Sequence, residues 1–359
     1  MRIIHLINTY YLYFMVCAVL GPMKMSKLGT TLTHEYLVND FSTLHSHSSE
    51  PIYDFKSSSL QNFGYVKQYP YSHLYNLRLN DENGIVATFD DVKLFKEANG
   101  GTIVEKSSCS SRNISLLKSI SEETKVNIII GTGYYITDTT NLLSCTTTTE
   151  EMYNQMYDEF ENGCKNCRDV KPAFIADGGN ILLDFEKRAL RAIGEFQGQY
   201  RYPVSFHPEK DVIPLIEVMR IYQEAGGQPT EFVMSHMDRT MMSCKEDLME
   251  FIDDTKCYIQ FDQFGVESSF YQFNPFIDIM SDAQSIKLIA LLKQDNKLKR
   301  VLMSHDIHTK HRLTAFGGLG FAHITKNVVP NMLKRYFDLQ DIILIRNENP
   351  YRWLNRLNL

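Results

Sequence analysis

Six short apolar segments of this sequence carry a histidine or an aspartate at or near their carboxyl ends. The segments are Thr31–Tyr36, Phe174–Gly179, Pro203–Pro208, Phe232–Asp238, Tyr258–Asp262 and Val301–His308. A short apolar run is typical of a buried parallel strand, and its polar residue then stands at the end of that strand. Imidazole and carboxylate groups are ligands of divalent metals, which activate water for hydrolysis. The pattern therefore predicts a metal-dependent hydrolase whose ligands come from several strands.

The intervals between these segments have the length and the apolar periodicity of helices. The expected helices cover residues 90–98, 111–123, 150–160, 185–199, 213–225, 245–255, 284–294 and 327–337, with two more strands at 101–105 and 126–130. Eight strands that alternate with helices predict a (β/α)8 TIM barrel with right-handed crossovers. In such a barrel the carboxyl ends of all strands meet at one mouth, so residues far apart in sequence can share a site.

We expect a single metallo-dependent hydrolase barrel over residues 16–359, an ordinary length for this fold. Residues 1–15 are an upstream apolar extension or a leader. A polar stretch at about residues 39–83, rich in Ser, Tyr and His, predicts a long loop. This loop leaves from the strand that carries His34, so we expect it to form part of the pocket wall.

Composition and charge exclude several classes of function. Hydrophobic residues make up 43% of the chain and charged residues 22%, which is an ordinary globular balance. The formal charge is −6 and no stripe of Lys and Arg with interleaved aromatics is present, so we expect no nucleic-acid partner. Seven cysteines in so long a chain do not indicate a disulfide framework. The single CxxC at Cys164–Cys167 favours a loop with two free thiols over a metal or redox site.

The first twenty residues leave two localisations open. Residues 3–20 contain no charge and resemble a signal sequence or an anchor in length. Polar and tyrosine residues interrupt this run, and Val16–Leu20 reads as a small strand that leads into the fold. We expect a cytoplasmic protein without membrane contact. The alternative is a secretory protein whose leader lies in residues 1–20.

Several of these segments resemble the phosphotriesterase-related proteins of the amidohydrolase superfamily. The most specific blocks are Ser26–Glu35, Ser235–Thr240, Tyr258–Gly265, His305–Lys310 and His323–Pro330, and they occur in the family's order. The resemblance runs from about Val16 to the C-terminus, nearly the whole chain.

This resemblance implies two divalent metals, usually zinc, in a β/α barrel. By position it makes His34 the first ligand on strand 1 and places Asp177 where the bridging carboxylate stands on strand 4. It implies that His207 and His236 bind the second metal and that Asp306 binds the first. The metals would lower the pKa of a water molecule and polarise the bond it attacks, and Asp306 would take the proton as the catalytic residue.

The sequence departs from the family pattern at two of these positions. Tyr36 stands where the second histidine of strand 1 belongs, and a phenol with a pKa near 10 is a poor metal ligand. Asp177 stands where close relatives have a glutamate, which is one methylene longer. The resemblance thus implies two metals per chain, while Tyr36 leaves a single metal open. Tyr36, Arg239 and His308 are candidates for substrate binding, although a salt bridge accounts equally well for Arg239.

The resemblance to the animal branch of the family implies hydrolysis of an amide in a small molecule, N-acetyltaurine or a related N-acyl amino acid. An anionic substrate of this kind suits a cation at the mouth, for which Arg239 and Lys310 are candidates. Two alternatives stay open. One is a phosphotriesterase or lactonase; the other is a catalytically impaired barrel that acts as a binding or scaffold protein, as Tyr36 and Asp177 would indicate.

Overall fold

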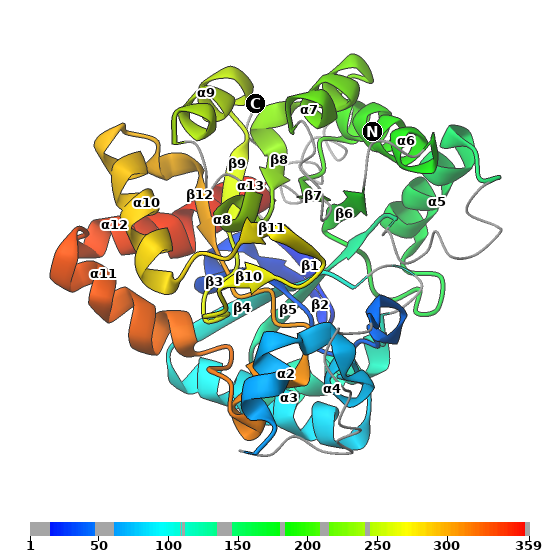
Figure 1. Ribbon diagram of the computed structural model, residues 1–359. Helices are drawn as coiled ribbons and strands as arrows, with labels where there is room; N and C mark the ends of the chain where they lie inside the picture. Colours follow the sequence, from blue (N-terminus) through cyan, green and yellow to red (C-terminus); the bar gives the residue numbers. More distant parts are fainter. Residues whose placement is uncertain are drawn as a thin grey trace.

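A sheet of eight parallel strands forms the centre of the molecule (Figure 1). The computed structural model describes residues 15–46, 61–107, 109, 112–134, 146–179, 184–208, 215–240 and 245–355. Within them the sheet consists of β3 (Thr30–Glu35), β4 (Gly100–Glu105), β5 (Asn127–Thr132), β6 (Phe174–Gly179), β7 (Val204–Pro208), β8 (Phe232–Met234), β9 (Tyr258–Phe261) and β12 (Val301–Met303). Neighbours in sequence are neighbours in the sheet, except that the short strands β10 and β11 lie outside it.

The first and last strands of the sheet meet through side chains as well as backbone. The backbone N–H of Asp306 donates to the carbonyl of His34 at 3.1 Å, and that of Tyr36 donates to the carbonyl of Ile307 at 3.1 Å. The Ser304 hydroxyl also donates to the His34 carbonyl at 2.9 Å. The buried carboxylate of Glu35 accepts from the backbone of both His305 and Ile307 at 2.9 Å. These bonds close the sheet into a barrel and confirm the predicted (β/α)8 fold.

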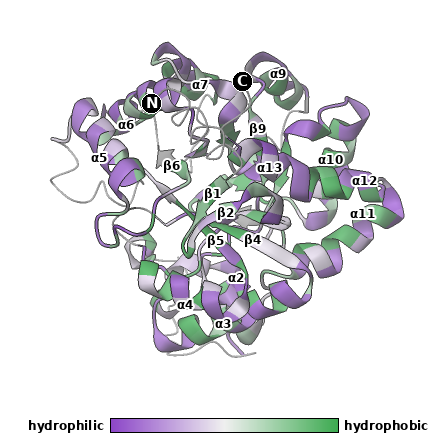
Figure 2. Ribbon diagram, turned by 180° about the vertical axis from the view of Figure 1, so that it is seen from behind, coloured by the Kyte–Doolittle hydropathy of each residue, from purple (hydrophilic) through white to green (hydrophobic). Residues whose placement is uncertain are grey.

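Helices surround the barrel, and their apolar faces point at the strands (Figures 1 and 2). The main ones are α3 (Glu82–Glu97), α4 (Ile114–Thr124), α5 (Thr149–Asn162), α6 (Asp184–Tyr200), α7 (Leu215–Glu224), α9 (Lys245–Thr255), α10 (Asp282–Gln294) and α11 (Val329–Arg335). On α4 the stripe of Ile114, Leu117 and Ile120 is buried, and each side chain contributes about 1.5–3 kcal/mol. Capping boxes at the starts of α5 and α10 satisfy the first free N–H groups of these helices.

The amino-terminal end of the barrel is closed by apolar side chains. The antiparallel hairpin of β1 (Met15–Ala18) and β2 (Gly21–Lys24) lies on this side, as the rear view shows (Figure 2). The fully buried Trp353 of α13 (Asn349–Leu354) packs in one cluster with side chains of β4, β5, β6 and β12. Short helical elements α12 (Leu339–Ile343), η10 (Ile324–Val328) and η11 (Leu344–Glu348) complete the C-terminal region. Buried apolar side chains therefore close this end of the barrel.

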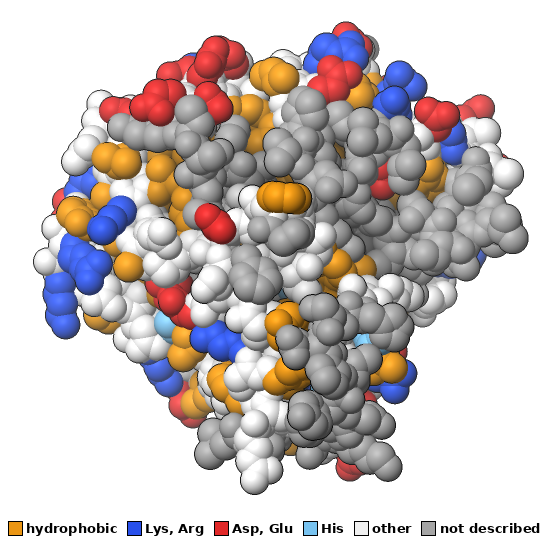
Figure 3. All heavy atoms as spheres, viewed as in Figure 1, with side chains coloured by type: hydrophobic (Ala, Val, Ile, Leu, Met, Phe, Trp, Pro, Cys, Tyr) orange, Lys and Arg blue, Asp and Glu red, His pale blue; other side chains and the backbone are white. Residues whose placement is uncertain are grey.

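The opposite mouth is built from connections rather than from the barrel itself. The predicted long loop at 39–83 contains a short helix, α2 (Phe63–Gln68), in its described part. Helix α8 (Met237–Thr240) follows β8, and the hairpin of β10 (Phe270–Tyr271) and β11 (Asn274–Asp278) lies over the barrel centre in Figure 1. Acidic and basic side chains are interspersed on this face (Figure 3). None of the described helices is both long and apolar enough to cross a lipid bilayer.

Candidate metal centre

Three histidines from three different strands converge at the carboxyl-terminal mouth of the barrel. His34 ends β3, His207 lies in β7 and His236 follows β8, and all three are buried. Their ligand atoms lie within 4.8 Å of one another, and among the described residues this is the one group of three or more that could hold a metal ion. The Nε2 atoms of His34 and His207 are 2.7 Å apart. This donor set, buried nitrogens that face one another, fits a zinc ion.

The carboxylate of Asp262, just after β9, orients two of these histidines. Its Oδ2 lies 2.7 Å from Nδ1 of His34 and its Oδ1 lies 2.7 Å from Nδ1 of His236. Burial alone would raise the pKa of Asp262, yet the two histidines hold that pKa well below its usual range. Burial lowers the pKa of His236, so a neutral imidazole donates from Nδ1 to a carboxylate. Each Nε2 is then left as the metal-binding atom, the arrangement that raises ligand basicity in metal sites.

Asp306 completes this side of the centre. Its Oδ1 lies 3.4 Å from Nε2 of His34, and its Oδ2 accepts from the side-chain amide of Gln263 at 3.4 Å. The backbone of Asp306 has φ 55° and that of His236 has φ 58°, both in the left-handed region that non-glycine residues rarely adopt. Strain of this kind costs on the order of 1–3 kcal/mol and clusters at functional sites. Two such residues, one after β8 and one after β12, mark this mouth as the functional end of the barrel.

Tyr36 points into the same centre. Its hydroxyl lies 3.2 Å from Nε2 of His207, and its ring packs edge-on against those of His34 and Phe41. The phenol thus stands beside the histidine cluster and is only 3% exposed. The centre therefore presents three imidazoles, two carboxylates and one phenol, each in contact with at least one other member.

The structure places Asp177 in β6, where its backbone is paired with that of Phe206. The residue paired with His207 is Gly178. Neighbouring side chains of β6 alternate: Ile175 packs in the helix-facing core and Ala176 packs inside the barrel. The side chain of Asp177 lies outside the described atoms, so its predicted bridging role remains a prediction.

Lys106, directly after β4, has no place in the sequence-based prediction of the site. Its side chain is 1% exposed, and Nζ has no hydrogen-bond partner among the described residues. The ammonium group lies 4.8 Å from the centre of the Phe174 ring and 5.6 Å from that of Trp353. Burial lowers the pKa of Lys106 to about 7, although the carboxylates of Asp262 and Asp306 act in the opposite direction. Within the described part of the chain, the barrel thus holds a buried amine without a hydrogen-bond partner near the metal centre.

Arg239 and His308, the other predicted substrate-binding residues, lie at the rim of the centre. Arg239 is buried, donates from Nη2 to the carbonyl of Pro208 at 3.0 Å and stacks on the Tyr271 ring at 4.6 Å. The Nδ1 of His308 donates to the Asp306 carbonyl at 2.7 Å. The substrate-binding roles of Arg239 and His308 stay predictions.

Lys310, the other cation considered at the mouth, has its charge engaged elsewhere. It is fully buried, ion-paired with Asp81, and packed on the Tyr75 ring at 3.4 Å. We therefore do not assign it to the substrate.

Sequence reasoning noted the Tyr258–Asp262 strand but did not include Asp262 among the site residues. The signal was present, because Asp262 ends an apolar run as the other polar residues do. It also missed Gln263 and Lys106, which likewise directly follow strands or strand ends. Glu35 and His305, in contrast, turn away from the centre and pair with each other at 2.7 Å across the barrel seam.

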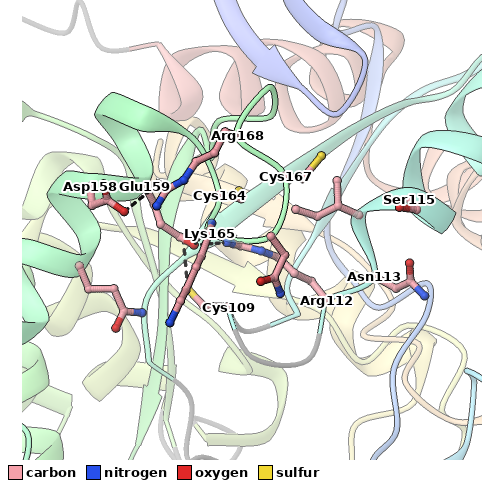
Figure 4. A pocket seen from close by; sticks show the side chains of 13 residues that line it. Cys109, Arg112, Asn113, Ser115, Asp158, Glu159, Cys164, Lys165, Cys167 and Arg168 are labelled. Atoms are coloured by element: carbon pink, nitrogen blue, oxygen red, sulfur yellow. Dashed lines mark hydrogen bonds and ion pairs between the residues drawn. The ribbon is translucent and has the colours of Figure 1, made fainter.

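A second hollow of about 860 Å³ lies between α4, α5 and the CxxC turn (Figure 4). It shares no lining residue with the histidine cluster. Cys164 and Cys167 form no disulfide, and no thiol of the described residues belongs to a group of three potential metal ligands. Burial raises the pKa of Cys164 to about 12, which keeps this thiol protonated. The CxxC turn is thus a loop with two free thiols. The hollow is also lined by a buried ion pair, Arg112 with Glu159 at 2.5 Å.

Comparisons with known proteins agree with this geometry. The model of the phosphotriesterase family matches residues 15–354. Proteins named phosphotriesterase-related protein are 39% identical over 346 residues in Drosophila pseudoobscura pseudoobscura and 40% identical over 349 residues in Drosophila mojavensis. These alignments cover 94% and 95% of this chain and 97% and 98% of the two relatives.

Solved structures with a similar fold come from bacteria. A resiniferatoxin-binding protein from Rhodobacter sphaeroides superposes with a TM-score of 0.88 at 24% identity and covers 95% of each chain. A phosphotriesterase homology protein from Escherichia coli, complexed with phosphate in its active site, gives 0.73 at 22% identity over 91% of this chain and 99% of that one. A lactonase from Listeria monocytogenes gives 0.72 at 18% identity over 95% and 98%. At identities below 25% these structures show the fold alone. The family model matches nearly the whole chain, so this protein belongs to the phosphotriesterase family.

Proposed function

We propose that this protein is a zinc-dependent hydrolase that cleaves the amide bond of N-acetyltaurine or a related N-acyl amino acid. The observation that carries the proposal is the convergence of His34, His207 and His236 with Asp306 at one barrel mouth. Three imidazoles suffice to hold one zinc ion with an open position for water or substrate, and the carboxylate of Asp306 lies beside them. The choice of an amide rests on the resemblance to the animal phosphotriesterase-related proteins.

Zinc held by these residues would supply Lewis-acid chemistry, lowering the pKa of an attacking water and polarising the carbonyl. The residues of the chain divide the remaining work. Asp262 holds the rings of His34 and His236 in place through their Nδ1 atoms. Asp306 Oδ1, beside His34, is placed to accept the proton of the water and to deliver it to the leaving amine. Tyr36 Oη, beside His207, is placed to donate a hydrogen bond to the substrate carbonyl.

A test of the metal and of the reaction uses the purified full chain. We expect about one zinc per chain by elemental analysis, and hydrolysis of N-acetyltaurine that His207→Ala abolishes together with most of the bound zinc. Asp254, an exposed residue of α9, offers a control, since Asp254→Ala should change neither quantity. A metal-free protein whose melting temperature does not change on chelation would contradict the proposal and favour a binding or scaffold role.

Two observations favour a second candidate, hydrolysis of an ester. One structural neighbour is a lactonase, and another holds phosphate in its active site. The same preparation should therefore be assayed with lactones and with a neutral phosphotriester. Higher kcat/KM for either of these than for N-acyl amino acids would replace the amide in the proposal and keep the zinc centre.

A further inference from the structure

A small hollow opens beside the metal centre and contains no acidic side chain among its described lining residues. It lies between α2, the β10–β11 hairpin and the segment that follows β12. Two of its lining residues touch Asp306: Gln263 approaches Oδ2 at 3.4 Å, and His308 approaches Oδ1 at 3.4 Å. A substrate whose scissile carbonyl lies at the histidines would therefore extend past Asp306 into this space.

The charged groups of this hollow are cations. Lys67 of α2 is half-buried, and the structure describes no ion pair or hydrogen bond for its ammonium group within the described residues. Arg312 is buried and uses Nη2 on the carbonyls of Phe264 and His305, at 2.9 and 3.1 Å. The described lining of the hollow thus contains two cations and no acidic residue, although the whole chain has a net charge of −6. A local excess of positive charge beside a catalytic centre attracts an anionic ligand.

Aromatic rings set the size of the hollow. The Tyr71 ring lies 4.2 Å from that of Phe273 and 5.8 Å from that of His308, to which it is nearly parallel. The Tyr71 hydroxyl donates to Nε2 of His308 at 2.9 Å, because Nδ1 of this histidine already donates to a carbonyl. The Arg239 guanidinium lies over Tyr271, a lining ring, on the side of the metal centre. The rings of Tyr71, Tyr271 and His308 thus line a hollow of about 50 Å³, so a ligand group that enters it must be compact.

We propose that this hollow is the binding subsite for the anionic end of the substrate, a carboxylate or a sulfonate, and that Lys67 is its specificity-determining residue. The inference deepens the proposed function, because it assigns the acid group of an N-acyl amino acid to a particular place. The anionic group of the substrate lies far from the bond that is cleaved. Lys67 would therefore stabilise the bound substrate and the transition state equally.

The first experiment compares kinetics of the zinc-loaded full chain on two matched substrates, N-acetyltaurine and a neutral N-acetyl amine of the same length. Lys67→Met should raise KM for the anionic substrate about tenfold or more, because a charge-assisted hydrogen bond is lost, and should leave kcat unchanged. The neutral substrate should change less than about twofold. Lys67→Arg should restore most of the affinity, and the control Lys287→Met, on the exposed face of α10, should behave as the parent protein.

The second experiment does not depend on hydrolysis. Ethanesulfonate and propionate serve as probes in a thermal-shift titration of the zinc-loaded protein. Both probes should raise the melting temperature of the parent protein and of Lys287→Met. In Lys67→Met their affinity should be about tenfold lower. The probe that binds more tightly tells whether the site prefers sulfonate or carboxylate. If no amide is cleaved but this anion effect persists, the subsite stands while the proposed reaction fails. An equal effect of Lys67→Met on charged and neutral substrates, or anion binding that is indifferent to the variant, would overturn the inference.

Discussion

On the β9 side of the barrel mouth the carboxylate of Asp262 pairs with both His34 and His236, whereas on the β4 side the amine of Lys106 has no hydrogen-bond partner among the described residues. We call Asp262, His34 and His236 the paired wall, and Lys106, which directly follows β4, the unpaired wall. The hydroxyl of Ser205, two residues before His207, also has no partner among the described residues.

The two walls differ in what they do before a metal binds. On the paired wall a charged acceptor fixes the tautomer and the orientation of two rings, so the ligands are pre-organised. On the unpaired wall the same low-dielectric interior disfavours the ammonium form of Lys106 and moves its pKa to about 7, because burial is the largest influence. One side of the centre is therefore held in place by hydrogen bonds, while the other side holds a group that weakens the metal-free fold.

The largest effect should come from breaking the paired wall. Asp262→Ala removes the acceptor of two imidazole N–H groups, so we expect zinc affinity to fall roughly 10–100-fold. The free energy of unfolding should fall by about 3 kcal/mol, since two charge-assisted hydrogen bonds are lost. Competition with a zinc chelator measures the first quantity and urea denaturation the second. Wild-type values for both would show that Asp262 does not orient the histidines.

Removing the amine of the unpaired wall should raise the free energy of unfolding, in contrast to Asp262→Ala. Lys106→Met keeps the apolar volume, and we expect it to stabilise the zinc-free protein by on the order of 1–4 kcal/mol. The pKa of Lys106 is lowered from 10.5 to about 7, so between these pH values the unfolded chain holds a proton that the folded chain does not. The stability of the parent protein should therefore rise as pH increases from about 7 toward 10.5, and this slope should weaken in the variant.

Thermal unfolding of the chelated protein at several pH values measures this difference. Lys287→Met provides the control, because Lys287 is exposed on α10 and its substitution should leave the pH slope unchanged. A variant that is less stable than the parent protein would mean that Lys106 has a partner that stabilises its charge.

The smallest effect concerns Tyr36, which lies between the two walls. Tyr36→His adds an imidazole beside His207, so we expect the zinc content to rise above that of the parent protein and the rate to increase by less than about tenfold. Tyr36→Phe removes only the hydroxyl and should leave the zinc content unchanged. Elemental analysis and initial rates give both numbers, and an unchanged zinc content in Tyr36→His would end the idea that the phenol limits the number of metals.

Much of the architecture could be predicted from local patterns. The predicted strand at 126–130 is β5, and the predicted helix at 245–255 is α9, because a short apolar run and a 3.6-residue periodicity are properties of a segment by itself. The helix predicted at 90–98 is the second half of α3, which begins earlier at Glu82. Its first turn is polar and is defined by the cap that Asp81 forms with the N–H of Gly84, a contact that periodicity does not reveal.

The amino-acid sequence by itself determined which segments alternate and therefore that His34, His207, His236 and Asp306 lie at the same end of a barrel. It did not determine which atoms of these residues face one another. Three features are consequences of how the eight strands close: Asp262 binds both Nδ1 atoms, Lys106 is buried without a partner among the described residues, and His236 and Asp306 adopt left-handed backbone. The physical reason is that periodicity acts along a single segment, whereas hydrogen bonding, burial and charge depend on distances between strands that only the closed barrel sets.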